Sequence, residues 1–155
     1  MSEIKRIANQ LERANRGDAW HGPSLTQVLR DIDAETAASH PIVSAHSIWE
    51  IALHIAVWSD IVRHRLAGNK LGDPPAEEDW SVPIDKGSAG WTATIDRVDQ
   101  ANDRLLTAIL ALDDRQLDEI VPGKGFSVYD ILHGVVQHNL YHAGQIVMLK
   151  KASRT

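Results

Sequence analysis

The chain has 155 residues, with 16 Lys and Arg against 21 Asp and Glu, a net charge of −5 and no cysteine. This length suits a single domain over residues 1–155, and the acidic balance argues against nucleic acid as a partner, because phosphate binding needs a basic surface. The absence of cysteine excludes disulfides, thiolate metal ligands and a cysteine nucleophile. No apolar stretch approaches a membrane span and no signal-peptide pattern opens the chain, so we expect a cytoplasmic protein without a membrane partner.

The first half of the chain predicts two long helices and a short one between them. Apolar residues at helical spacing over residues 4–14 form one face of a first helix, which Gly17 ends. A capping-box pattern at Ser24 opens the short helix. A second capping box, Ser47 with Glu50, opens the next long helix, and Gly68 is placed to stop it.

The second half predicts two more long helices. Residues 69–87 are rich in Pro, Gly and acidic residues, which indicates a long loop over the end of the bundle with Trp80 as an anchor. A helix over 88–112 follows, on one face of which the apolar residues are spaced alternately by four and three positions. This face also contains the polar Asn102, which needs a hydrogen-bond partner there. A last helix starts at Ser127 and runs to Ala152. We therefore predict an all-α four-helix bundle with one extra short helix.

Two histidines of the last helix face the predicted core. At about 100° per residue, His138 and His142 fall on the apolar side, one turn and about 6 Å apart along the axis. Both imidazoles can then reach one ion at Zn–N distances near 2.0–2.1 Å. His54 flanks the apolar stripe of a facing helix and is available as a third ligand. The alternative is that His138 and His142 are buried histidines whose hydrogen-bond partners are backbone carbonyls or a carboxylate. The remaining histidines lie off the core faces or outside the helices: His21, His40, His46, His64 and His133.

Three neighbouring side chains have open roles. Gln145 is one turn beyond His142 and either orients a ligand or is an ordinary amide at the edge of the core. Glu50 is one turn before His54, where its capping role already accounts for it. Asp79, in the long loop, is a candidate fourth ligand, and a fourth protein ligand would favour a structural over a catalytic metal.

Two segments carry a family resemblance. Residues 46–55 (HSIWEIALHI) and 138–146 (HNLYHAGQI) resemble the two signature blocks of the DinB/YfiT-like family. The resemblance implies a four-helix bundle, commonly with an up-down-down-up course, and frequently a homodimer. It also implies a divalent metal, zinc or nickel most often, held by residues that match His54, His138 and His142. Some relatives are S-transferases or isomerases that use a low-molecular-weight thiol.

These features lead to two hypotheses about function. In the first, the protein is a metal-dependent S-transferase that uses an external low-molecular-weight thiol on a small-molecule substrate, since a coordinated thiol loses its proton. A metal-dependent hydrolase is an alternative, because coordination lowers the pKa of water towards 7. In the second, the bundle binds metal without catalysis and acts through a dimer interface. No general base is evident, because the candidate Tyr141 points off the core face. The metal is not identified either, since imidazole ligands suit several divalent metals.

Overall fold

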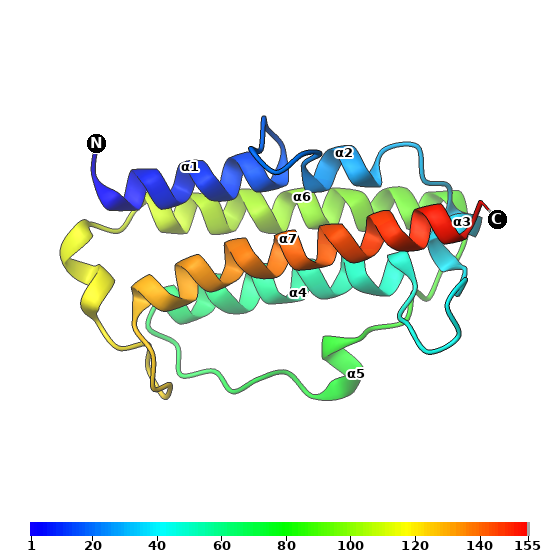
Figure 1. The fold of residues 1–155 in the computed structure, drawn as a ribbon. Helices are drawn as coiled ribbons and strands as arrows, with labels where there is room; N and C mark the ends of the chain where they lie inside the picture. Colours follow the sequence, from blue (N-terminus) through cyan, green and yellow to red (C-terminus); the bar gives the residue numbers. More distant parts are fainter. Residues whose placement is uncertain (155) are drawn as a thin grey trace.

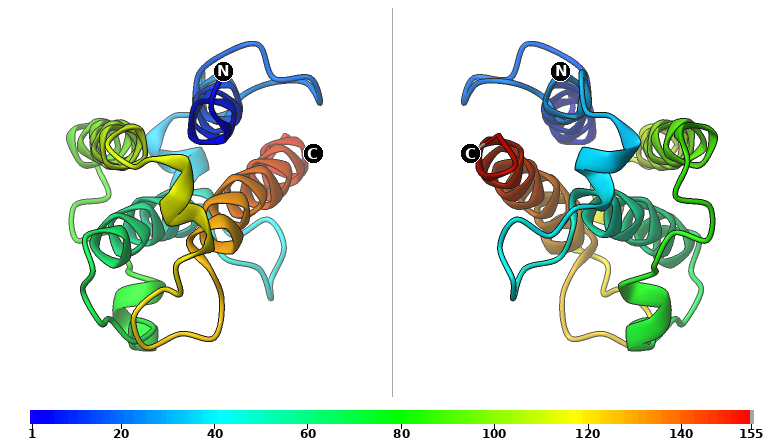
Figure 2. Two further views of the ribbon diagram at one scale, coloured as in Figure 1. Left: turned by 90° about the vertical axis from the view of Figure 1, so that its left-hand side faces the viewer. Right: turned by 90° about the vertical axis from the view of Figure 1, so that its right-hand side faces the viewer.

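The computed structural model describes residues 1–154, and within them β-structure is confined to one isolated bridge between Ile120 and Ser127. The predicted all-α bundle is confirmed. Its four long helices lie around a common core in the end-on views of Figure 2: α1 (Glu3–Asn15), α4 (Ile48–Leu66), α6 (Ser88–Leu110) and α7 (Val128–Ala152). Over the same residues, no helix is long and apolar enough to cross a membrane.

The bundle has more short helices than the one predicted. The helix expected after Ser24 is α2 (Leu25–Leu29), and the others are α3 (Ala34–Ala38), α5 (Ala76–Asp79) and a 3₁₀ helix, η1 (Asp114–Asp118). These three are not predicted from the sequence, because elements of four or five residues are too short to establish a helical period. Side-chain caps mark the starts of α3 and η1 instead, as where the Asp33 side chain accepts a hydrogen bond from the backbone of Thr36.

The course of the chain is up-down-down-up. The colours of Figure 1 show that α1 and α7 run in one direction and that α4 and α6 run in the other. Since α4 and α6 are parallel and pack together, the chain must travel back along the length of α4, roughly 28 Å for its 19 residues. The prediction that residues 69–87 cover the bundle's end is therefore wrong. They run along its side and carry α5 (Figure 1).

The predicted helix starts and stops are confirmed in detail. Complete capping boxes open α4 at Ser47 and α7 at Ser127, and at the start of α2 the Gln27 side chain accepts a hydrogen bond from the Ser24 backbone. Beyond α4, Gly68 has a φ of +85°, the left-handed conformation that suits glycine after the last turn of a helix. The two long helices that contain the candidate histidines are thus fixed at their N-terminal ends by side-chain hydrogen bonds.

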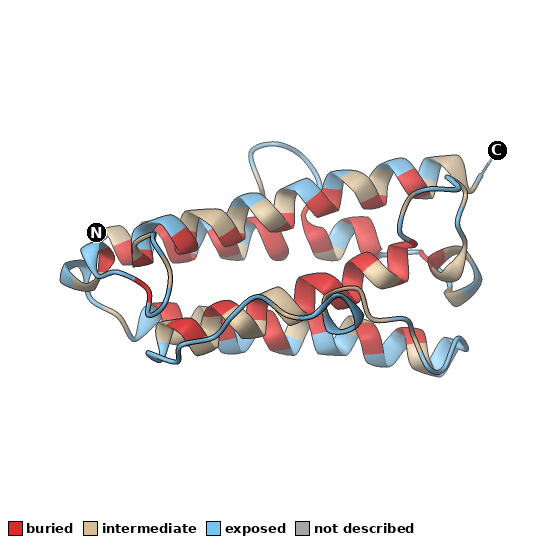
Figure 3. Ribbon diagram, turned by 90° about the horizontal axis from the view of Figure 1, so that it is seen from below, coloured by how far each residue is buried: buried red, intermediate tan, exposed pale blue. Residues whose placement is uncertain are grey.

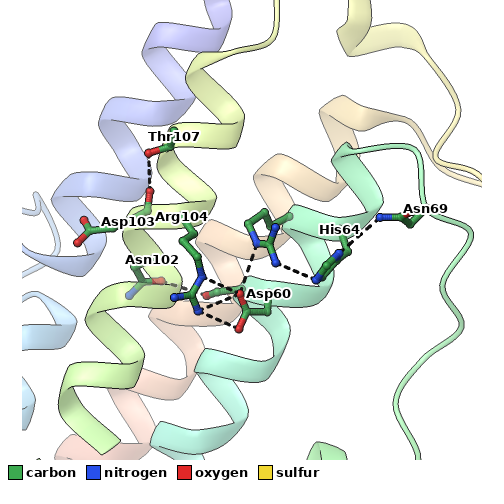
Figure 4. Close-up of polar contacts among 9 residues, drawn as sticks. Asp60, His64, Asn69, Asn102, Asp103, Arg104 and Thr107 are labelled. Carbon is green, nitrogen blue, oxygen red and sulfur yellow. Dashed lines mark hydrogen bonds and ion pairs between the residues drawn. The ribbon is translucent and has the colours of Figure 1, made fainter. Parts of the chain in front are cut away.

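The buried faces of the helices turn inward (Figure 3) and form two apolar clusters. Along α4, α6 and α7 a buried polar layer lies between these clusters. In it, the predicted partner for Asn102 is found, because Ser59 donates a hydrogen bond to its Oδ1 at 3.0 Å. Outside this layer, the Arg104 guanidinium contacts both carboxylate oxygens of Asp60 at 3.1 Å and joins α6 to α4 (Figure 4). The candidate histidines belong to the same polar layer.

Candidate metal centre

Three histidines meet where α4 faces α7. His54 comes from the middle of α4, and His138 and His142 come from successive turns of α7. One ring nitrogen of each lies within 4.8 Å of those of the other two, so the group could hold a metal ion. His54 and His142 are 4% and 5% exposed. The five histidines set aside in the sequence analysis are not part of any such group among residues 1–154.

Each of the three rings has an oxygen acceptor at its Nδ1 atom. For His54 the acceptors are the Asp79 carboxylate at 2.8 Å and the Asp79 carbonyl at 3.0 Å. His142 faces the Gln145 Oε1 at 2.7 Å, and His138 faces the Asn139 Oδ1 at 3.2 Å. Because these oxygens only accept, each Nδ1 is the donor, and each neutral ring then carries a free lone pair on Nε2.

This arrangement leaves two lone pairs facing each other. The Nε2 atoms of His54 and His138 are 3.0 Å apart, and neither carries a proton when both Nδ1 atoms do. Only a cation or an added proton between them satisfies both. Two imidazoles on one tetrahedral zinc, with Zn–N of 2.0–2.1 Å, would have their nitrogens roughly 3.3 Å apart. The donor set therefore fits a divalent metal.

The surroundings keep the imidazoles neutral, which metal binding requires. Burial lowers the pKa of His54 and of His138 below the usual range. Burial also lowers the pKa of His142 to about 4, and the charge of the nearby His138 adds to this effect. Near neutral pH all three rings are therefore available as ligands.

The connection between α4 and α6 covers the His54 side of the site. Trp80 stacks on the His54 ring with a centroid distance of 3.9 Å and an interplanar angle of 6°. Its other face stacks on His46 at 3.6 Å and 2°. One residue earlier, the Asp79 carboxylate also accepts a hydrogen bond from the Trp58 indole at 2.7 Å. Trp80 thus anchors the segment, as predicted.

The structure assigns contacts to the three side chains whose roles were open. Gln145 orients His142, and its amide group in turn donates to the Tyr141 hydroxyl at 3.1 Å. Glu50 completes the capping box of α4. Asp79 does not belong to the group that could share an ion within residues 1–154. It contacts Nδ1 of His54, the nitrogen that points away from the other rings, so it orients this histidine.

Sequence reasoning missed two residues at the site. His46 was set aside because it precedes the cap of α4, yet its ring supports Trp80. Trp58 is only partly buried, and its indole holds Asp79 in place. Helical phase could not find these contacts, since they depend on where an irregular segment crosses α4.

Comparison with known proteins identifies the family of the chain. The sequence model of the DinB superfamily matches residues 19–146, a region that includes all three clustered histidines. No curated protein and no solved structure matches the chain. Because the family match covers most of the sequence, the chain belongs to the DinB superfamily.

Proposed function

We propose that the protein binds one divalent metal ion through the Nε2 atoms of His54, His138 and His142. The observation that carries this proposal is the facing pair of unprotonated nitrogens 3.0 Å apart. Oxygen partners at the three Nδ1 atoms are typical of histidines that bind metals, where they fix the ring and raise its basicity. Three neutral ligands leave the ion its full charge and room for a further ligand, as in catalytic zinc sites. Zinc or nickel is the expected metal.

We further propose that the site catalyses S-transfer from an external low-molecular-weight thiol to a small electrophilic molecule. A bound divalent ion would supply Lewis acidity, which lowers the pKa of a coordinated thiol or water. In the overall reaction the thiol sulfur bonds to carbon, the displaced group leaves with its electron pair, and the thiol proton is released. The chain has no cysteine of its own, so the sulfur must come from a second molecule.

The residues of this chain prepare the site for that chemistry. Asp79 and Gln145 hold two of the imidazoles in one orientation before a ligand arrives, which reduces the cost of assembling the site. Trp58 and Trp80 lie against the His54 ring and restrict access of water from that side. The family resemblance also suggests a homodimer, which we propose and which sedimentation equilibrium would test.

Metal content is the first test. We expect about one equivalent of zinc or nickel per chain after reconstitution and gel filtration, measured by elemental analysis, and its loss in His142→Ala. The matched control is His133→Ala, which removes an imidazole from the same helix but outside the group. Equal metal content in both variants, or none in the parent, would refute the site.

Cobalt substitution tests the thiol. With Co²⁺ in the site, a small thiol that enters the coordination shell should produce an intense sulfur-to-cobalt charge-transfer band, whereas its alcohol analogue should not. Failure of several thiols to produce this band, together with turnover of activated esters, would favour the hydrolase. Absence of both would favour metal binding without catalysis.

A further inference from the structure

A cavity of about 330 Å³ starts at the candidate metal centre and extends between α4 and α7. His138 lies in its wall at one end, and Arg65 and Asp130 lie about two helical turns further along. The side chains between the two ends are apolar, namely Trp58, Val62, Phe126, Ile131 and Val135. A volume of this size is at the lower end of the range that small-molecule sites occupy.

Arg65 places a buried cation at the far end of the cavity. The residue is 3% exposed, and its guanidinium lies 5.6 Å from the Trp58 ring centroid. Its Nη2 donates to the Gly72 carbonyl at 3.0 Å and to Asp73 at 2.8 Å, while its Nε has no hydrogen-bond partner among residues 1–154. A buried donor of a charged group without a partner is costly, which suggests that a ligand completes it.

The carboxylates near Arg65 do not neutralise this end of the cavity. Asp73 is 66% exposed and shares one oxygen between Arg65 and the Lys124 ammonium, which lies at 2.8 Å. Asp130 accepts hydrogen bonds from the backbone and hydroxyl of Ser127 at the start of α7, where the helix dipole also offsets its charge. One shared carboxylate for two cations leaves a place for a second anion.

Gly134 keeps the cavity open. It lies within α7, where a glycine is about 1 kcal/mol less favourable than alanine. It does not have the positive φ that would require glycine, and a Cβ added there would meet no atom within 4 Å. The backbone therefore gives no reason for glycine at this position, and a larger side chain would project into the cavity that Gly134 lines.

We propose that this cavity binds a small molecule with an apolar body and one carboxylate, which pairs with Arg65 while the other end faces His138. This ligand would be the substrate of the metal centre, so this inference rests on the function proposed above. The binding step itself does not require the metal, because Arg65, the apolar walls and Gly134 are present without it. Binding to metal-free protein can therefore be tested separately from catalysis.

The test uses 4-phenylbutyrate and its neutral amide, titrated into the full chain in the presence of EDTA and followed by tryptophan fluorescence and calorimetry. We expect the carboxylate to bind about tenfold more tightly than the amide, as one hydrogen bond to a charged group would give. Equal affinities would overturn the inference, since they would leave an apolar cavity without anion recognition. Binding that requires zinc would also overturn it, because the carboxylate would then be a metal ligand.

Two glycines of α7 provide a matched pair of variants. Gly134→Leu should fill the cavity and abolish binding, whereas Gly144→Leu, on the same helix and also with open space at its Cβ, should bind as the parent does. Both changes improve helix propensity, so neither is expected to unfold the bundle. Arg65→Met should remove the preference for the carboxylate, and Arg65→Lys should retain part of it. Unchanged binding in Gly134→Leu would refute the location.

Metal loading distinguishes this inference from the proposed function. If His142→Ala loses the metal but still binds 4-phenylbutyrate, the cavity is independent of the centre, as we expect. If the parent binds no metal but does bind the carboxylate, the proposed function fails while the anion site stands.

Discussion

Replacing Asp79 with asparagine tests whether the oxygen partner of His54 controls metal affinity. The Asp79 carboxylate is 22% exposed, lies 2.8 Å from Nδ1 of His54 and accepts from the Trp58 indole at 2.7 Å. Asparagine keeps the shape and one acceptor oxygen but removes the negative charge, so the bond that raises the basicity of His54 weakens. Losses of 10–100-fold in affinity are usual for such partners, which is about 1.4–2.7 kcal/mol.

The assay is competition for zinc against a chromophoric chelator at constant pH. Glu77→Gln is the control, because it removes one negative charge from the same short helix, α5, without altering a contact to the histidines. We expect the control to match the parent and Asp79→Asn to be at least about tenfold weaker. If both variants bind zinc as the parent does, Asp79 does not prepare His54 for the metal.

Three further predictions concern the stability of the protein and the Trp80 side chain that covers His54. Thr94→Val should lower the free energy of unfolding by about 1–3 kcal/mol in chemical denaturation, because it leaves the buried Trp49 indole, now 2.8 Å from the Thr94 hydroxyl, without an acceptor. Metal-free protein should become less stable as the pH falls from about 6.5 to about 4, because the unfolded chain takes up a proton at His142 before the folded chain does. Denaturation at several pH values should show this slope, and His142→Gln should reduce it. Trp80→Ala should release the cover over His54, which would appear as faster metal release in stopped-flow chelation with little change in helix content by circular dichroism.

The long helices and the three histidines could be predicted from the sequence because both depend on helical phase. Capping boxes marked where α4 and α7 begin, and the 3.6-residue period placed His138 and His142 on one side of α7. His54 faces the core on α4, and α4 packs against α7, so His54 lies beside His138 and His142.

The surroundings of the histidines could not be predicted in the same way. The contacts of Asp79 and Trp80 depend on the path of residues 67–87, and an irregular segment has no period that fixes which way a side chain points. The sequence predicted that Asn102 has a hydrogen-bond partner, because a buried polar group needs one. It did not identify this partner as Ser59. Short elements such as α3 could not be predicted either, because four or five residues do not establish a helical period.

The parallel course of α4 and α6 has a consequence for how such a centre can be built. Antiparallel neighbours in a bundle are joined by 2–8 residues at one end, and a loop of that kind would leave the His54 side of the bundle bare. Residues 67–87 return across the middle of α4 and bring the Asp79 carboxylate and the Trp80 indole to His54. The topology, and not the helices alone, therefore provides the outer wall of the centre. A redesign in which a short loop joined α4 to an antiparallel helix would keep the three imidazoles. It would lose the contacts of Asp79 and Trp80 that hold His54 in place.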